Sequence, residues 1–169
     1  MKKFFSLLLL ALPMAFINTS CSDDDDLPDV DITLTVSNCQ KVGNEIYVVQ
    51  GDAMKIDAIN VVNKEEGKAA AITSASYYWD QVYLGTSIVS PFGFEIQTVK
   101  AEGENPGTPL GRHLLQIESP LLAVDKEIAT CVLVYTVNVV ASADDIPEGG
   151  VTTFTDTPAM KSGGSDTAK

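Results

Sequence analysis

Between residues 27 and 141 the sequence alternates apolar and polar residues with the two-residue period of β-strands, and it shows little helical periodicity. In "DITLTVS", Ile32, Leu34 and Val36 alternate with polar residues. In the longer "ATCVLVYTVNVV", one face carries five apolar or aromatic side chains: Cys131, Leu133, Tyr135, Val137 and Val139. The opposite face of this segment is also rich in valine, which predicts a strand at the centre of a sheet or covered on both faces.

About eight such segments follow one another at spacings of roughly ten residues, separated by turn signals and loops. This spacing favours an all-β, antiparallel β-sandwich of about 7–9 strands over a parallel α/β sheet. We assign the sandwich to residues 31–141, a length sufficient to bury two inner sheet faces. Residues 142–169 are rich in Gly, Ser, Thr, Asp and Pro. They are predicted to form a flexible tail, with an edge strand around residues 151–154 as the alternative.

The first 20 residues have the composition of an export leader. Lys2 and Lys3 form a basic start, and "FFSLLLLALPMAFI" follows as an apolar stretch. This stretch is shorter than the ~20 residues that span a bilayer. Residues 1–20 are therefore predicted to be a signal peptide, and the chain is expected to be exported.

A cysteine follows the leader in "NTSCSDDDD", residues 18–26. The segment resembles a bacterial lipoprotein signal, in which cleavage occurs just before a diacylated cysteine. This resemblance implies lipidation of Cys21, with residues 21–30 as an acidic tether. The residues after the cysteine resemble the acidic export signal of surface lipoproteins, and that signal would comprise Ser22, Asp23, Asp24, Asp25 and Asp26.

The resemblance implies a protein anchored by lipid in the outer membrane and facing the cell exterior. One alternative is that the anchored protein is retained on the periplasmic side. The other is an ordinary secretory cleavage site followed by a solvated acidic linker. A calcium site in the aspartate run is disfavoured, because consecutive acids lack the alternating geometry of calcium loops.

The charge excludes one class of partner. The chain has 11 basic and 23 acidic residues, a net charge of −12. Residues 1–20 contain two lysines and no acids, so the chain from residue 21 has nine basic and 23 acidic residues, or −14. Nucleic acid would be repelled by such a protein, and no nucleic-acid partner is predicted.

Residues 75–94, "ASYYWDQVYLGTSIVSPFGF", narrow the fold further. An alternating strand ends at Trp79, a turn opens at Asp80, and the triplet Leu84-Gly85-Thr86 and the segment Pro91-Phe92-Gly93-Phe94 follow. This order, with the later "GRHLLQI", resembles the immunoglobulin-like repeats of bacterial surface proteins and polysaccharide-degrading enzymes. Gln81 stands where those repeats have a turn glycine. The resemblance implies an immunoglobulin-like sandwich, a fold that hosts many unrelated functions.

Cys39 and Cys131 remain once Cys21 is assigned to lipidation. They are an even pair in an oxidising compartment, which makes a disulfide one prediction. Two buried thiols that act as small apolar side chains are the other.

His113, the only histidine, matches the structural Gly-x-His position of the repeats. Neither a catalytic triad nor a metal site is predicted around it, because no converging ligands flank it. No cofactor is predicted.

Tyr77, Tyr78, Trp79 and Tyr83 form the aromatic cluster of the sequence. Strand alternation places Tyr77 and Trp79 inward as core residues. Tyr78 and Tyr83 are then the candidates for ligand contact, as exposed aromatic rings on which a glycan could stack.

These observations predict a non-catalytic cell-surface binding module for a protein or glycan partner, with the loop of residues 100–110 as a further contact region. A structural or assembly subunit of a surface structure is the alternative. A glycan-degrading or peptidase accessory enzyme is less favoured, because no carboxylate pair stands out.

Overall fold

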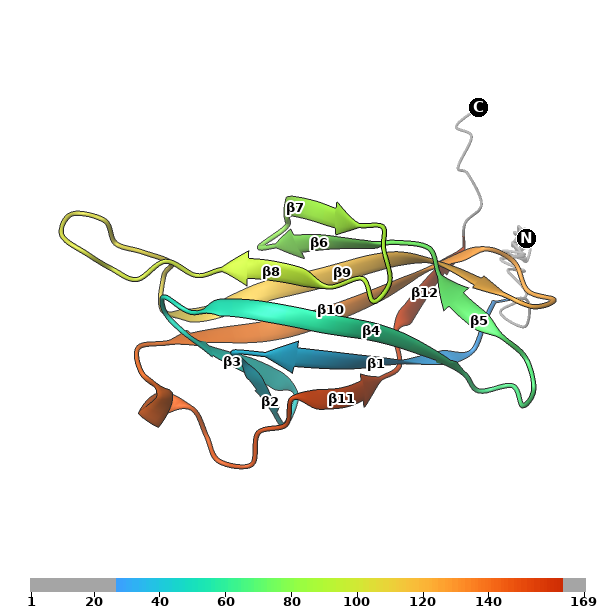
Figure 1. The fold of residues 1–169 in the computed structure, drawn as a ribbon, viewed down its shortest axis with the longest axis horizontal. Coiled ribbons are helices and arrows are strands. Elements are labelled where there is room, and N and C mark those ends of the chain that lie inside the picture. Colours follow the sequence, from blue (N-terminus) through green and yellow to red (C-terminus); the bar gives the residue numbers. More distant parts are fainter. Residues whose placement is uncertain (1–26, 163–169) are drawn as a thin grey trace, which may run out of the picture.

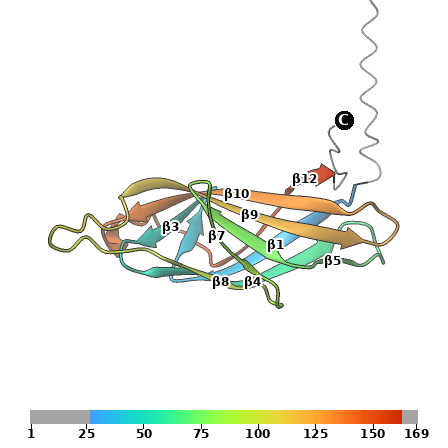
Figure 2. The same ribbon diagram turned by 90° about the horizontal axis from the view of Figure 1, so that it is seen from above.

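A computed structural model describes residues 27–162, which form two packed β-sheets (Figures 1 and 2). The strands in chain order are β1 (Val30–Ser37), β2 (Gln40–Val42), β3 (Glu45–Val49), β4 (Ala53–Asn63), β5 (Ala70–Ile72), β6 (Ala75–Trp79), β7 (Val82–Ser87), β8 (Phe94–Gln97), β9 (Gly111–Ala123), β10 (Ala129–Val140), β11 (Thr153–Asp156) and β12 (Ala159–Ser162). A short 3₁₀ turn, η2 (Ala143–Asp145), precedes β11.

The smaller sheet has the order β11-β1-β4-β8, and the larger has the order β2-β3-β10-β9-β6-β7. Two short strands add to the larger sheet, β12 beside β10 and β5 beside β9. Pairing is antiparallel throughout, except that β3 runs parallel to β10. The predicted all-β, immunoglobulin-like sandwich is therefore confirmed. The described chain contains more strands than predicted because short edge hairpins and the C-terminal segment add to it.

The alternation in the sequence corresponds to the two faces of the strands. Burial alternates along the whole of β1, and its inward residues Ile32 and Leu34 are each 1% exposed. The five predicted inward residues of β10 are all buried. β10 lies between β3 and β9, as its valine-rich sequence predicted, but Val134 on its outer face is 54% exposed. Residues on the outer face of the larger sheet are thus available to solvent.

Aromatic residues of β6 and β8, from the two sheets, pack against each other at one side of the core. Tyr77 is fully buried, and its ring stacks on Phe94 with the ring centroids 4.4 Å apart. The Tyr77 hydroxyl donates a hydrogen bond to the Phe92 carbonyl. Phe94 lies directly under Gly85, where an added Cβ would come within 3.0 Å of the ring. The predicted inward position of Tyr77 is confirmed, and Trp79 is partly buried against the same core.

The N-terminal boundary of the domain lies earlier than predicted. Pro28 and Val30, assigned from the sequence to the tether, are buried. Val30 is the first inward residue of β1, and the Asp29 carbonyl accepts a hydrogen bond from the Lys64 backbone N–H. The end of the predicted tether is therefore part of the sandwich.

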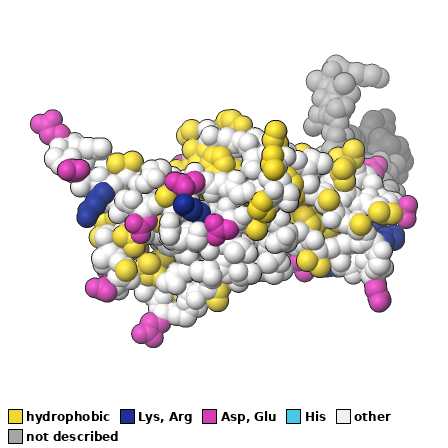
Figure 3. All heavy atoms as spheres, in the orientation of Figure 1, with side chains coloured by type: hydrophobic (Ala, Val, Ile, Leu, Met, Phe, Trp, Pro, Cys, Tyr) yellow, Lys and Arg dark blue, Asp and Glu magenta, His cyan; other side chains and the backbone are white. Residues whose placement is uncertain are grey.

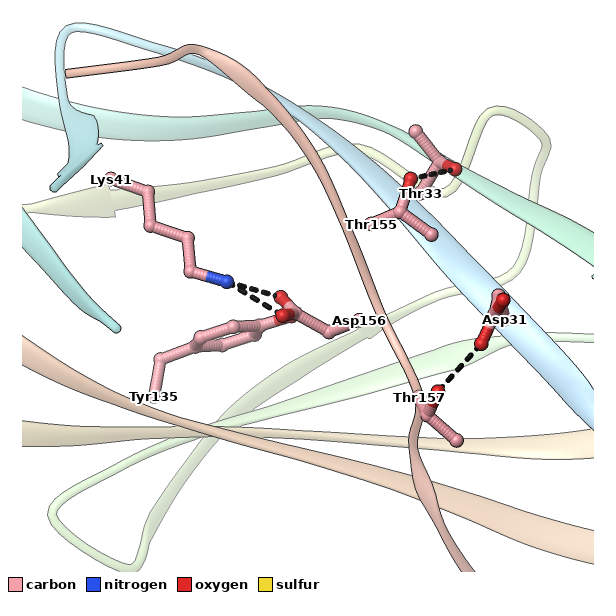
Figure 4. A network of polar contacts seen from close by, with 7 residues as sticks. All are labelled: Asp31, Thr33, Lys41, Tyr135, Thr155, Asp156 and Thr157. Carbon is pink, nitrogen blue, oxygen red and sulfur yellow. Dashed lines mark hydrogen bonds and ion pairs between the residues drawn. The ribbon is translucent and has the colours of Figure 1, made fainter. Parts of the chain in front are cut away.

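The predicted flexible tail is wrong for most of its length. Residues 143–162 form η2, β11 and β12, so that β11 extends the smaller sheet and β12 the larger one. The segment has few apolar residues of its own. It is held in place by contacts with residues of other strands. Phe154 packs edge-on against Tyr135 with centroids 5.7 Å apart, and Asp156 forms an ion pair with Lys41. The hydroxyls of Thr33 and Thr155 share a hydrogen bond between β1 and β11, and the hydroxyl of Thr157, just after β11, donates to the Asp31 carboxylate of β1 (Figure 4).

Among the residues that the structure describes, no helix is long and apolar enough to cross a bilayer.

Candidate functional site

The outer face of the larger sheet carries a row of side chains that crosses four strands. Val134, Gln116, Tyr78 and Tyr83 are successive cross-strand partners on β10, β9, β6 and β7. Outward residues of antiparallel strands in register lie side by side, so the pairing itself assembles the row. An open pocket of about 350 Å³ lies on this face and is lined by Tyr78, Gln81, Gln116 and Glu118.

The two tyrosines predicted as ligand contacts are neighbours in this row. Their ring centroids are 5.5 Å apart and the rings are tilted by 59°. Tyr78 lines the pocket, and Tyr83 lies next to it on the same face. Tyr83 is 56% exposed, and its hydroxyl shares a 2.8 Å hydrogen bond with Thr86. Exposed apolar side chains continue from Tyr83 along β7 and the following loop (Figure 3): Val82, Leu84, Ile88 and Val89.

Polar groups of β9 line the other side of the pocket. The Gln116 amide donates a 3.0 Å hydrogen bond to the Glu118 carboxylate. The Lys161 ammonium of β12 lies 3.1 Å from the same Glu118 oxygen. Aromatic rings therefore adjoin an amide and a charge-paired carboxylate, an arrangement that offers both an apolar surface and hydrogen-bonding groups to a ligand. Gln81, Gln116 and Lys161 were not predicted as site residues. Gln116 and Lys161 are brought to this face only by the register between strands distant in sequence.

The turn between β6 and β7 holds Gln81 at the pocket. Asp80 and Gln81 both have positive φ, 48° and 69°, as a tight two-residue hairpin turn requires. The Asp80 carboxylate accepts hydrogen bonds from the Leu114 backbone N–H at 2.8 Å and from His113 Nδ1 at 2.7 Å. His113 therefore serves as a structural clamp on this turn, as its sequence context predicted.

The two ring nitrogens of His113 face acceptors. Nδ1 meets the Asp80 carboxylate, and Nε2 lies 2.8 Å from the Pro109 carbonyl, so the doubly protonated ring satisfies both contacts. Burial lowers the pKa of His113, but the Asp80 and Pro109 contacts outweigh burial and raise the pKa above its ordinary value of 6.5. Burial likewise opposes a low pKa for Asp80, but hydrogen bonds from His113 and Leu114 leave it below 3.8.

These shifts predict how stability depends on pH. Because the His113 pKa is raised in the folded state, its contribution is complete below pH 6.5 and is lost as pH rises through the folded-state pKa. Urea unfolding should show that the natural protein is more stable than His113→Gln at low pH. This difference in the free energy of unfolding should shrink as the pH rises from 6.5 through the folded-state pKa of His113. The change should be below about 1 kcal/mol, because Asp80 is half exposed and solvent screens the pair. A difference that is independent of pH would contradict the clamp.

The two remaining cysteines are not joined. Cys39 lies between β1 and β2, Cys131 lies in β10, and both are free and buried. Burial raises the pKa of Cys39 to about 12 and also raises the pKa of Cys131, so both thiols stay protonated at neutral pH. The alternative of two buried thiols is the arrangement observed, and the predicted disulfide is absent from the structure.

The other predicted functional positions lie apart from this pocket. Cys21 and the acidic signal of residues 22–26 lie outside the described residues. The loop of residues 100–110 projects from the opposite end of the sandwich to β5 (Figure 1). Within residues 27–162, no group of three or more His, Cys, Asp or Glu side chains is placed to hold a metal ion.

The described part of the protein is an immunoglobulin-like β-sandwich domain, because its two sheets pack face to face. The end of the chain contributes β11 to the smaller sheet and β12 to the larger one. No protein-family model matches the chain. No curated protein matches it either. It is similar to a solved structure described as "Structures of Clostridium thermocellum CbhA fibronectin(III)-like modules", with 12% identity and a TM-score of 0.40. The match covers 67% of this chain and 47% of the other, so this chain spans about half of that structure's length.

Proposed function

We propose that this protein is a non-catalytic binding module, held at the cell surface by a lipid on Cys21, which binds a glycan at the Tyr78–Tyr83 face of its larger sheet. The observation that carries the proposal is the cross-strand row in which Tyr83 pairs with Tyr78 and Tyr78 pairs with Gln116. A pyranose ring has one face of C–H groups and a rim of hydroxyls. Tyrosine rings suit the C–H face, since aromatic faces are apolar and electron-rich.

The polar groups of the pocket suit the hydroxyl rim. Gln81 and Gln116 supply amides that both donate and accept hydrogen bonds, and Glu118 supplies acceptor oxygens. Glu118 is the one carboxylate that lines this pocket, whereas glycoside hydrolysis uses a pair. This composition favours binding without hydrolysis.

The proposed membrane attachment and export of the protein rest on its sequence. Cys21 and the acidic tract after it resemble a surface-lipoprotein signal, and acyl chains on a cysteine make a durable anchor. A module displayed in this way would hold its ligand at the outer membrane.

Glycan binding is tested with an array followed by calorimetry on the glycan that binds. Tyr83→Ala and Tyr78→Ala should each weaken binding by about threefold to tenfold, since an aromatic contact contributes about 0.5–1.5 kcal/mol. Val62→Ala is the matched control, because Val62 is 53% exposed on the other sheet. It should bind as the natural protein does.

The variant Gln81→Gly distinguishes an effect on glycan binding from an effect on the stability of the fold. Glycine relieves the positive φ at this position, so the variant should be more stable by about 1 kcal/mol. It also lacks the amide that lines the pocket, so its affinity for the glycan should fall. Binding to no glycan on the array, or unchanged affinity in both tyrosine variants, would refute the proposal.

A further inference from the structure

Apolar side chains are exposed at the end of the sandwich where β5 meets β9 and β10. Leu122 is 43% exposed, Val124 is 49% exposed and Ile128 is 61% exposed. Ala71 of β5 pairs with Leu122 of β9. The β9–β10 register, in which Leu121 faces Ala129, brings Ile128 to the other side of Leu122. These residues form an apolar row at the tip of the larger sheet, which we call the end patch: Ala71, Leu122, Val124 and Ile128.

A shallow hollow accompanies the end patch. Its volume is about 310 Å³, and its lining consists entirely of alanine, leucine and valine: Ala69, Ala70, Ala71, Leu122, Ala123 and Val124. The Ala69 carbonyl accepts a hydrogen bond from the Val124 N–H, which joins the loop before β5 to the β9–β10 turn. The end patch is therefore a continuous surface built by the loop before β5, by the β9–β10 turn and by the strands β5 and β9.

The beginning of the described chain lies at this same end. Val30 of β1 pairs with Asn63 at the end of β4, and the Lys64 ammonium is 3.0 Å from the Asp29 carboxylate. Lys64 opens the loop that leads to Ala69. Figures 1 and 2 show the start of β1 beside β5 and the β9–β10 turn, away from the loop of residues 100–110.

The length of chain before this point limits where the domain can lie. Cys21 precedes Leu27 by six residues in sequence. Fully extended, six residues span roughly 20 Å. β10 alone has 12 residues and spans roughly 40 Å. A lipid on Cys21 would therefore keep the end patch near the bilayer. If the sandwich stands upright on the membrane, its opposite end is too far away to touch the membrane surface.

The charges around the end patch are mostly paired. Glu65 lies 2.8 Å from Lys68 and 3.1 Å from Lys126. Lys68 is also 3.9 Å from Asp125 in the β9–β10 turn. A rim with both signs of charge suits the headgroup region, and the apolar row suits the boundary with the acyl chains.

We infer that the end patch is a membrane-contact surface that rests on the lipid bilayer when Cys21 is acylated. This inference rests on the lipid anchor of the proposed function. It adds a defined orientation, in which the loop of residues 100–110 faces outward and the Tyr78–Tyr83 face stands at the side of the molecule.

Tryptophan fluorescence on the full, acylated chain tests this orientation. Leu122→Trp places an indole in the end patch, and Leu110→Trp places one at the opposite end, where Leu110 is 55% exposed. Each protein is purified from a host that acylates lipoproteins and is reconstituted in phosphatidylcholine vesicles with brominated acyl chains. Trp79 is the single natural tryptophan, so its emission is subtracted with the unsubstituted protein.

We expect at least half of the added emission of Leu122→Trp to be quenched, with a blue shift, and that of Leu110→Trp to persist. Val124→Trp should behave as Leu122→Trp does and guards against a local folding defect at one position. Equal quenching at both ends, or none in the end patch, overturns the orientation. The intact mass distinguishes the two proposals. An acylated protein without quenching refutes the membrane contact alone, whereas a protein without acyl groups refutes the anchor and the membrane contact together.

Discussion

Asp156→Ala should lower the free energy of unfolding by about 3 kcal/mol, because it leaves a buried ammonium without its counter-charge. Lys41 is 8% exposed, and its Nζ lies 2.6 Å and 2.7 Å from the two Asp156 oxygens. The Tyr135 hydroxyl donates to the same carboxylate at 3.0 Å. Burial, and then the Asp156 charge, raise the pKa of Tyr135, so the phenol stays protonated as a donor.

Two comparisons isolate the cause of this loss. Glu95→Ala breaks the Lys55–Glu95 pair, whose side chains are 43% and 52% exposed, and should cost at most about 1 kcal/mol. The double variant Lys41→Met with Asp156→Leu removes both charges and should recover most of the stability. Urea unfolding measures all three. A loss for Asp156→Ala no larger than that for Glu95→Ala would mean that Lys41 escapes to solvent and that β11 is not held by this pair.

Cys21→Ala should abolish membrane attachment, because the acyl chains on this cysteine provide the proposed anchor. In cells fed labelled palmitate, the natural protein should carry the label in the membrane fraction. The variant should be unlabelled and soluble, since the anchor provides about 0.8 kcal/mol per buried methylene group. Cys39→Ala is the matched control, because Cys39 is 7% exposed and should not affect labelling.

The acidic tract is tested separately from the lipid. Replacing Asp23, Asp24, Asp25 and Asp26 with asparagine should leave palmitate labelling intact but remove the protein from the cell surface, as measured by protease added to whole cells. Labelled palmitate on Cys21→Ala would contradict the anchor. Unchanged surface exposure of the asparagine variant would contradict the export signal.

Strand alternation predicted the parts of the fold in which one chain segment carries the whole pattern. β10 is an example, because its inward residues recur at every second position within one uninterrupted segment. An edge strand around residues 151–154 was only the alternative to a flexible tail, because Phe154 is the single large apolar residue of β11. The stability of β11 depends on Lys41 and Tyr135, which its own sequence does not reveal. A local pattern contains no information about a partner such as Lys41, which is 115 residues away from Asp156.

The candidate site shows the same limit at smaller scale. Tyr78 and Tyr83 were predicted because strand alternation turns these two aromatic residues outward within one hairpin. Gln116 is an ordinary polar residue on β9, and only its pairing with Tyr78 places it in the pocket. Register between strands that are distant in sequence therefore determines the polar half of the site.

The position of β11 also affects when the domain can fold. Its bonds to β1 include one between Thr33 and Thr155, which are 122 residues apart. During synthesis the smaller sheet lacks this edge strand until nearly the whole domain has left the ribosome. Closing so long a loop is entropically costly, and folds dominated by such distant pairings form slowly. We therefore expect the nascent chain to remain unfolded through most of translation, which would suit the export proposed from the sequence of residues 1–20.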